Sequence, residues 1–414
     1  MGRRPVAWRL RAIALLTAVG ACLAGATASA SAAEDPPFVA WNPLLPSLAQ
    51  PFEPSRERDC VGGEPQCIED TLSELYRRFD GLYATCDHNA AFGITYIRVT
   101  EAIREAINRG FYEEPAFLGH EDKVFARMYF AAHDAWAAGR RESVAPAWRE
   151  AFDSARDRKV NGQGNLLMSM NAHINRDMPF MLDALGLTKP DGASRKPDHD
   201  RGNVVLNTLY DDVLSELAKR FDPMTDDANV PGTVGDDAAV FQILQGWREQ
   251  VWRHAEMLGA AKSPEQRRLV AQYIEDYALG IARQIKSSTA ISDSSGRDAH
   301  CAAYRATHRE TGGLAEASGR RARVIRAGRA RVRVTCPGAV RDCAGTLGLQ
   351  RRGRRLTRSA PVALAAGESR VVALKLNRRG RKASRRRLRV LALTSSPSPW
   401  GTSRAASAKL RLRR

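Results

Sequence analysis

Apolar residues repeat with a helical period through the middle of the chain. In the segment IEDTLSELYRRF, the apolar side chains that share one helix face are Ile68, Leu72, Leu75, Tyr76 and Phe79. Later segments stop at Gly110 or Gly139, or start with Ser263 as the N-cap and Pro264 at the first helical position. The pattern predicts an all-α domain of seven or eight helices over residues 68–287.

Two long polar stretches interrupt this domain, and its end is marked by a change of period. Residues 188–202 and 222–235 are expected as loops, and the polar segment after residue 287 as a linker over residues 288–322. From residue 323 onward, apolar residues alternate in short runs such as ARVRVTC, PVALAAG and SRVVALKL. Six or so strands of this kind predict a small all-β sandwich over residues 323–414, with valines inward and arginines outward. The sandwich has no nucleophile, histidine or acid pair, so we expect a binding or spacer module.

The N-terminus has the order of regions found in a secretory signal peptide. Arginines precede a short apolar run, and small residues follow, so residues 1–33 are predicted to be removed on export. Val19 to Cys22 also resembles a lipobox, which would anchor the protein through Cys22. Residues 34–67 are Pro-rich and are expected to form an irregular arm. No later run is long and apolar enough to span a bilayer, so the expected location is secreted or on the outer face of the cell envelope.

Six cysteines remain beyond Cys22, an even number that favours disulfides in an oxidising compartment. Two pairs are close in sequence, and the remaining two cysteines would join the ends of the helical region. The expected bonds are Cys60–Cys67, Cys336–Cys343 and Cys86–Cys301. A zinc site built from cysteines is not expected, because no two pairs have the required double spacing.

Charge divides the chain into two parts. Residues 320–414 hold 28 Lys and Arg against two acids, a net charge of +26, whereas residues 34–319 carry about −12. Outside a cell, such a basic module suggests an anionic envelope polymer or membrane surface as partner. Trp400 is its one aromatic residue, which disfavours binding to single-stranded nucleic acid. A solvated, charge-decorated surface without a partner is the alternative, and the oligomeric state is left open.

One apolar helix, LLMSMNAHINRDMPFML, contains a polar cluster. Its members are Asn171, His173, Asn175, Arg176 and Asp177. Residues four apart share a helix face, so His173 is expected beside Asp177, and Asn171 beside Asn175 on another face. Pro179 cannot donate to the carbonyl of Asn175, so we expect a kink there.

Three interpretations of this cluster stay open. His173 and Asp177 could ligate a divalent metal such as zinc, or Asp177 could orient His173 as a general base. The cluster could also be a buried hydrogen-bond network in which Arg176 pairs with an acid of another helix. Arg248, between two tryptophans in sequence, could hold an anion or pack on their rings. Further histidines considered as supporting groups are His88, His133, His199 and His254.

Several blocks occurring in order resemble a bacterial family of unknown function. They include FGITYIRVTEAI, FLGHEDKVFARMYFAAHDAW, MNAHINRDMPFML and FQILQGWREQVWRHAEML. The hallmark of that family is an NAHINxDLP helix in an all-helical domain. The resemblance implies the helical fold and places Asn171, His173, Asn175 and Asp177 in the family motif, without an activity. The basic sandwich resembles immunoglobulin-like modules of exported bacterial proteins.

A second likeness concerns secreted zinc-dependent phospholipase C and related nucleases. These all-helical enzymes have His and Asp four apart on a core helix with a proline soon after, as at His173, Asp177 and Pro179. The second histidine that follows in those enzymes is absent here. Two hypotheses follow: an exported envelope-binding or scaffold protein whose basic sandwich contacts an anionic polymer, and a metal-dependent hydrolase that uses the His173/Asp177 helix.

Overall fold

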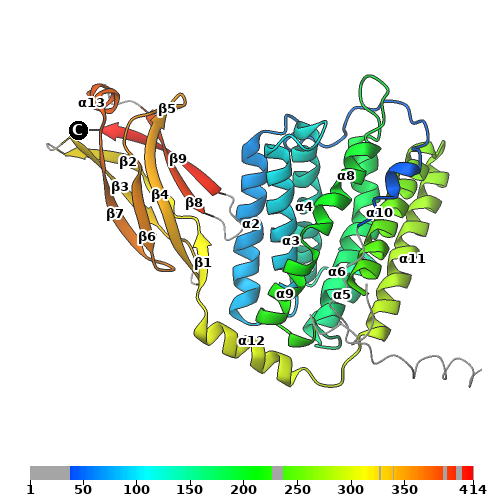
Figure 1. Ribbon diagram of the computed structural model, residues 1–414. Coiled ribbons are helices and arrows are strands. Elements are labelled where there is room, and N and C mark those ends of the chain that lie inside the picture. Colours follow the sequence, from blue (N-terminus) through cyan, green and yellow to red (C-terminus); the bar gives the residue numbers. More distant parts are fainter. Residues whose placement is uncertain are drawn as a thin grey trace, which may run out of the picture.

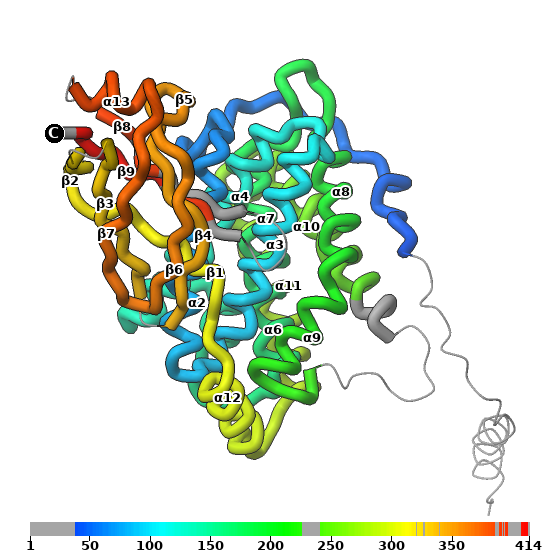
Figure 2. Tube along the Cα trace, turned by 60° about the vertical axis from the view of Figure 1, so that its left-hand side comes forward, coloured from blue at the N-terminus to red at the C-terminus, as the bar shows by residue number. Residues whose placement is uncertain are grey.

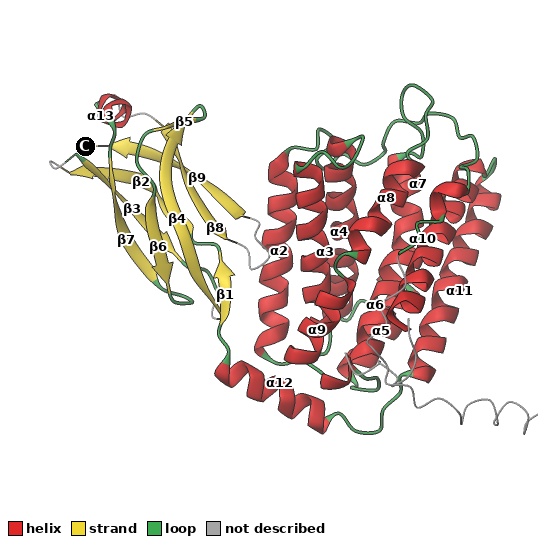
Figure 3. Cartoon of the chain, in the orientation of Figure 1, coloured by secondary structure: helices red, strands yellow, loops and turns green. Residues whose placement is uncertain are grey.

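The chain folds into a helical domain followed by an all-β domain that lies beside it (Figure 1). The computed structural model describes residues 38–225, 236–325, 328–338, 340–385, 389–397 and 403–413. Within these residues the expected order, an all-α domain and then an all-β sandwich, is confirmed, and Figure 3 shows a first domain of helices and a second domain of strands that also contains one short helix. No described helix has the length and apolar character needed to cross a membrane. The expected signal peptide, Cys22 and Trp400 lie outside the described residues.

The helices of the first domain follow the apolar pattern. They are α2 (Pro65–Ala84), α3 (Ala90–Asn108), α4 (Pro115–Ala137), α5 (Pro146–Arg156), α6 (Gly162–Asn171), α7 (Met178–Leu185), α8 (Lys196–Asn207), α9 (Tyr210–Arg220), α10 (Asp236–Ala260) and α11 (Pro264–Ser288). The face of α2 predicted from the sequence is buried. Gly110 and Gly139 end α3 and α4 with φ of +72° and +73°, a conformation that glycine adopts without steric cost. The Ser263 hydroxyl caps α11 by accepting from the backbone N–H of Gln266 at 3.1 Å.

The described helices of this domain outnumber the seven or eight predicted, and one of the two expected loops is partly helical. Residues 188–202 were expected as a loop, but α8 begins at Lys196 inside this stretch. Its polar side chains are buried: the Lys196 ammonium, for example, lies 2.8 Å from the Asp200 carboxylate. Paired polar groups can therefore fill core positions that a polarity pattern assigns to solvent. The other expected loop, residues 222–235, lies largely outside the described residues.

The segment before the first long helix crosses the helical domain without regular structure apart from the short 3-10 turn η1 (Asn42–Leu44). It is held by side chains of α10: the Trp41 indole donates to Gln242 at 2.7 Å, and the Asn42 amide donates to Glu249 at 3.1 Å. The expected irregular arm thus packs on the helices instead of extending freely into solvent.

The strands of the second domain are hydrogen-bonded into one continuous sheet, and this sheet folds over a single apolar core to form the sandwich. Its strands are β1 (Glu310–Gly313), β2 (Glu316–Ile325), β3 (Arg329–Thr335), β4 (Arg341–Arg351), β5 (Arg354–Arg355), β6 (Ala360–Leu364), β7 (Ser369–Lys375), β8 (Arg389–Pro397) and β9 (Ser403–Arg413), with the short helix α13 (Arg378–Ser384) before β8. The strand order is β1-β4-β8-β9-β2-β3-β7, and β5 and β6 also pair with β4. Pairs β1–β4 and β2–β9 are parallel and the others antiparallel. The valines of ARVRVTC are buried and its arginines exposed, as predicted. The likeness to immunoglobulin modules stays a prediction.

The expected linker, residues 288–322, is structured instead. It contains helix α12 (Ser295–Thr307), β1 and the first part of β2. Cys301 on α12 is buried in a disulfide with Cys86, which ties this helix to the end of α2. All three cysteine pairs predicted from the spacing are disulfides in the structure.

Arg341, at the start of β4, attaches the β domain to the helices. Its guanidinium is 2.9 Å from the Asp80 carboxylate of α2 and 3.1 Å from the Glu310 carboxylate of β1, and it lies over the Tyr76 ring. Glu310 in turn pairs with Arg220 of α9. Figure 2 shows β1 and β4 on the side of the sheet that faces the helical domain. Breaking such a buried pair leaves an uncompensated charge, so this contact holds the two domains together.

We predict unequal effects from removing the two disulfides of the helical domain. Cys86–Cys301 closes a loop with a sequence separation of 215 residues, and Cys60–Cys67 one of seven. The double variant Cys86→Ala/Cys301→Ala should lose about 4 kcal/mol of stability, roughly twice the loss of Cys60→Ala/Cys67→Ala, because the longer loop restricts the unfolded chain more. Denaturant unfolding followed by circular dichroism measures both losses. Equal losses would contradict this account.

Candidate functional site

The polar cluster predicted from the sequence lies in a widened helical turn. Between α6 and α7, residues Ala172–Asp177 form a π-helix, η3, rather than continuing the α-helix. Pro179 follows at the start of α7 and has no N–H to give to the preceding turn, so the chain widens just before it. Ala172 packs into one apolar core of the domain and Ile174 into a second. The irregular turn therefore lies at the centre of the domain, between both cores.

The Asp177 carboxylate is the most strongly bound group of this turn. It is 1 % exposed and accepts from the Trp148 indole at 2.8 Å, from His173 Nδ1 at 3.2 Å and from the Arg176 guanidinium at 2.9 Å. Burial alone would raise the pKa of Asp177. The hydrogen bond from His173 and the charge of Arg176 outweigh burial and hold this pKa below its ordinary value. Asp177 is therefore an ionised, fully paired carboxylate.

His173 is fixed by Asp177 and by aromatic rings. Its imidazole stacks on the Phe125 ring at 3.5 Å between centroids and meets the edge of Tyr96 at 4.8 Å. Burial lowers the pKa of His173 despite the hydrogen bond to Asp177, so the ring is neutral at pH 7. Because Nδ1 donates to an ionised carboxylate, Nε2 carries a lone pair. Nε2 is buried and has no hydrogen-bond partner among the described residues.

The opposite face of the turn forms the expected buried network. The Asn175 amide donates to Asn171 Oδ1 at 3.0 Å, and the Asn171 amide donates to the Ala278 carbonyl of α11 at 2.8 Å. Arg176 pairs with Glu275, also on α11, at 2.8 Å. Both four-residue spacings thus bring their partners together, and Arg176 pairs with an acid of another helix as the network interpretation predicted.

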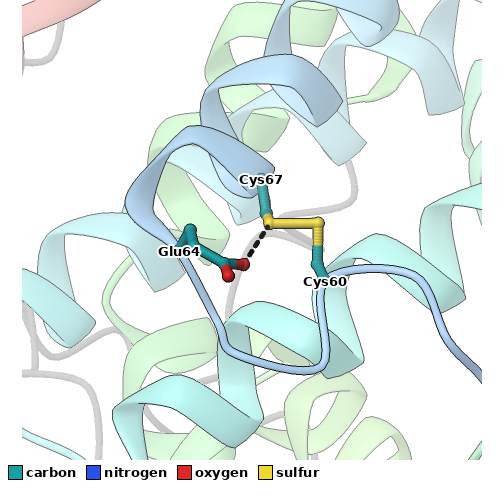
Figure 4. A group of neighbouring side chains, drawn as sticks. All are labelled: Cys60, Glu64 and Cys67. Atoms are coloured by element: carbon teal, nitrogen blue, oxygen red, sulfur yellow. Dashed lines mark hydrogen bonds between the residues drawn. A yellow bond between two sulfur atoms is a disulfide. The ribbon is translucent and has the colours of Figure 1, made fainter.

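The arrangement does not make His173 and Asp177 joint ligands of one metal ion. Three donors already occupy the oxygens of Asp177, and one of these donors is His173 itself. Among the described residues, the one group of three metal-ligating atoms that lie close enough together is Cys60, Glu64 and Cys67. Cys60 and Cys67 form a disulfide, as Figure 4 shows. The Glu64 carboxylate lies 3.6 Å from the Cys67 sulfur. Because both cysteines are oxidised, neither offers a thiolate that could bind zinc.

His173 lines a cavity of about 130 Å³ between α3, α4, α6, the π-turn, α7, α8 and α10. Most of its wall is apolar, formed by side chains such as Ile103, Phe125 and Leu244. The lining residues include five with a polar side-chain atom that is buried without a hydrogen-bond partner among the described residues: His173 Nε2, Asp122 Oδ2, and the hydroxyls of Tyr96, Thr100 and Tyr112. Buried polar atoms are paired in most proteins, so this concentration marks the cavity as the candidate site.

Arg248 contributes the positive charge of the cavity. Its guanidinium donates to Asn203 at 2.7 Å, to the His199 carbonyl at 2.7 Å and weakly to the Met178 sulfur at 3.6 Å. No described aromatic ring forms a cation–π contact with it, so the packing interpretation based on the neighbouring tryptophans does not describe its surroundings. A Cβ at Gly202 would lie 2.8 Å from this guanidinium, which shows how closely α8 approaches it.

A comparison with protein-family models shows which family the domain that contains this cavity belongs to. The model of a family of unknown function (DUF5995) matches residues 68–288, more than half of the chain. The chain belongs to this family. The DUF5995 match runs from α2 to the end of α11, so it includes every residue of the cavity and ends before the β domain. No curated protein and no solved structure matches the chain. The role of NAHINRDMP as the hallmark of the family stays a prediction.

Of the other histidines considered, the structure brings His199 alone to this cavity. His199 donates from Nε2 to the Arg248 carbonyl at 3.0 Å, and burial keeps its pKa well below the ordinary value. His88 instead contacts Asp298, and His254 contacts Gln250. His133 lies among aromatic rings of α4 and α5. These three side chains do not line the cavity of the DUF5995 domain.

Three acids of the cavity lining, Glu121, Asp122 and Asp198, were missed from the sequence. Burial raises the pKa of Glu121 and of Asp122 to about 7 each, so both are largely protonated below neutral pH. Glu121 is four residues from Phe117 and from Phe125, on the apolar stripe of α4. The position of the Glu121 carboxylate among apolar residues on one helix face was the feature of the sequence that could have indicated a buried acid. Tyr96, Thr100 and Tyr112 gave no signal, because single hydroxyl residues are common in helices and turns.

We predict that Glu121→Gln stabilises the protein at alkaline pH. The unfolded chain loses the Glu121 proton near pH 4.5, but the folded protein keeps it to about pH 7. The favourable contribution of protonated Glu121 is therefore complete below pH 4.5 and is lost as the pH rises through 7. The variant should match the wild type near pH 4 and exceed it by about 3 kcal/mol at pH 8 in urea unfolding.

The matched control is Glu265→Gln, because Glu265 is exposed on α11. It should change the free energy of unfolding equally little at both pH values. A Glu121→Gln protein that is less stable than the wild type at pH 8 would show that an ionised Glu121 has a favourable partner in the fold.

Proposed function

We propose that this protein is exported and that its β domain binds an anionic polymer of the cell envelope. The observation that carries the proposal is a group of nine exposed cations on one face of the sheet, called here the arginine face. Its members are Arg321, Arg323, Arg329, Arg331, Arg333, Lys375, Arg389, Lys409 and Arg411. They come from five neighbouring strands, in the order β8, β9, β2, β3 and β7.

The strand register concentrates the charge of the arginine face. Arg389 pairs with Arg411, and Arg411 with Arg321, so three arginines lie in one row across β8, β9 and β2. Arg323 lies opposite Arg331. The residues between them, such as Leu410 and Val332, are buried in the core of the domain, so the cations all point outward. Like charges directly opposite one another destabilise a sheet.

No compensating acid lies within ion-pair distance of these nine side chains in the described part of the chain. A bound polyanion would remove their mutual repulsion and release its own counterions, so both partners gain from the contact. The arrangement of the arginines therefore supports a binding surface. Solubility alone would not require arginines directly opposite one another on neighbouring strands.

A groove at one end of the sandwich extends the positive surface. It has a volume of about 570 Å³ between the β4–β5 hairpin and α13, which lie together in Figure 1. Five cations line it, namely Arg351, Arg352, Arg354, Arg379 and Lys382, and no acid does. A flexible chain with regularly spaced negative groups can follow such a groove onto the arginine face.

The form of the surface favours a phosphate- or carboxylate-bearing polymer over a single-stranded nucleic acid. The described strands contain no Phe, Tyr or Trp, so bases would find no ring to stack on. The helical domain is acidic overall and would be repelled by the same polymer. The β domain would therefore hold the DUF5995 domain at the envelope with its cavity away from the polymer. A metal-dependent hydrolase is not proposed, because Asp177 is engaged by three donors.

We predict salt-dependent binding of the full-length secreted protein to poly(glycerol phosphate), and no binding to neutral dextran. Affinity should fall steeply between low salt and about 0.5 M NaCl, because the Debye length drops to a few ångströms. Arg323→Glu/Arg331→Glu should weaken binding by about tenfold or more. The control Arg268→Glu/Arg283→Glu makes the same change of net charge on exposed positions of α11 and should bind like the wild type. Salt-independent binding, or equal losses in both variants, would refute the proposal.

We also predict that the single substitution Arg331→Glu stabilises the β domain while it weakens polymer binding. The substitution turns the repulsive pair with Arg323 into an attractive one, worth about 0.5 kcal/mol at low salt. Thermal unfolding at low and high salt measures the gain, which should shrink as salt screens the pair. A destabilised variant at low salt would mean that Arg331 already has a favourable partner.

A further inference from the structure

The cavity beside His173 has the size of a site for a small organic molecule. Its volume of about 130 Å³ is close to that of cavities of about 150 Å³ that take up a benzene ring. The ring of Phe125 and the side chains of Ile103 and Leu244 offer apolar walls to such a ring. The walls alone would suit any apolar molecule, so the polar atoms must decide what is recognised.

His173 supplies a hydrogen-bond acceptor. Its Nδ1 proton is committed to Asp177, so the buried lone pair of Nε2 can accept from an O–H group and cannot donate. The Tyr96 and Thr100 hydroxyls, which line the same cavity and are also unpartnered, can bind the oxygen of that group. A ligand hydroxyl placed here would satisfy several buried atoms at once.

Arg248 supplies a positive charge. None of the described carboxylates lies within ion-pair distance of its guanidinium, and one of its nitrogens has only a thioether sulfur as partner. Burial of this uncompensated charge lowers the pKa of Arg248. Glu121 and Asp122 are largely protonated at pH 6, so neither would repel an anion. The third acid of the lining, Asp198, is paired with Arg201 and accepts from two backbone N–H groups, which offset its charge. A ligand carboxylate is the group that this guanidinium lacks.

We infer that the cavity of the DUF5995 domain binds a small hydroxycarboxylic acid with an apolar body, whose carboxylate pairs with Arg248 and whose hydroxyl donates to His173 Nε2. Asp177 is a positioning residue in this site, because it acts through the His173 ring. The inference is independent of polymer binding, which uses the β domain.

The test is calorimetric titration of the full-length secreted protein at pH 6 with four probes. These are 4-hydroxybenzoate, 3-hydroxybenzoate, benzoate and phenol. At least one hydroxybenzoate should bind about tenfold more tightly than benzoate and phenol, since each of these lacks one of the two polar contacts. No saturable binding of either hydroxybenzoate up to about 10 mM, or affinities equal to that of phenol, would overturn the inference. This comparison needs no variant, so it decides even where a substitution unfolds the protein.

Two variants assign the contacts to residues. Arg248→Gln should make the preferred hydroxybenzoate bind no better than phenol, and His173→Phe should make it bind no better than benzoate. Arg253→Gln, on the same helix but bound to Glu249 and Glu256 outside the cavity, should leave all four affinities unchanged. Loss of every affinity in the Arg253 variant, or an unchanged hydroxybenzoate preference in the Arg248 variant, would contradict the assignment.

Discussion

The buried carboxylate of Asp177 is the interaction on which the centre of the helical domain depends. It is ionised in a protein interior, a state that is tolerated because donors from α5 and from its own π-turn surround it. These bonds fix the widened turn against Trp148 and set the orientation and protonation of His173. The open nitrogen of His173, and hence the chemistry of the cavity, follows from the pairing of a residue that does not line the cavity itself.

A second group of buried ion pairs holds the two domains together. Arg341 joins Asp80 of α2 to Glu310 of β1, and Glu310 reaches Arg220 of α9. The two domains carry opposite net charges, yet their contact uses a few paired and buried groups, while the arginine face stays exposed on other strands. The chain therefore combines an ion-paired junction with two separate surfaces, a charged sheet and a largely apolar cavity, that can act on different partners.

The sequence predicted the features that depend on local periodicity. The four-residue spacing predicted the contacts of His173 with Asp177 and of Asn171 with Asn175. The alternation of apolar and basic residues predicted that the arginines of β3 point outward. The spacing of the cysteines predicted all three disulfides. The sequence did not predict the features that depend on contacts between segments far apart in the chain. Lys196 and Asp200 are core residues because they pair with each other and with neighbouring helices, and Glu121 reaches the cavity only once α4 packs against α3 and α8. The linker was misread because α12 owes its place to a disulfide with a residue 215 positions away.

The protonation of the two ring nitrogens of His173 shows whether Asp177 sets the chemistry of the cavity. A ¹⁵N-detected NMR spectrum of the histidine side chains, assigned with a His173→Gln protein, distinguishes the protonated ring nitrogen from the bare one. At pH 7 we expect His173 to be neutral, with the proton on Nδ1 and a lone pair on Nε2. A proton on Nε2, or a doubly protonated ring, would contradict it, because the cavity would then hold a donor where the hydrogen bond to Asp177 requires an acceptor.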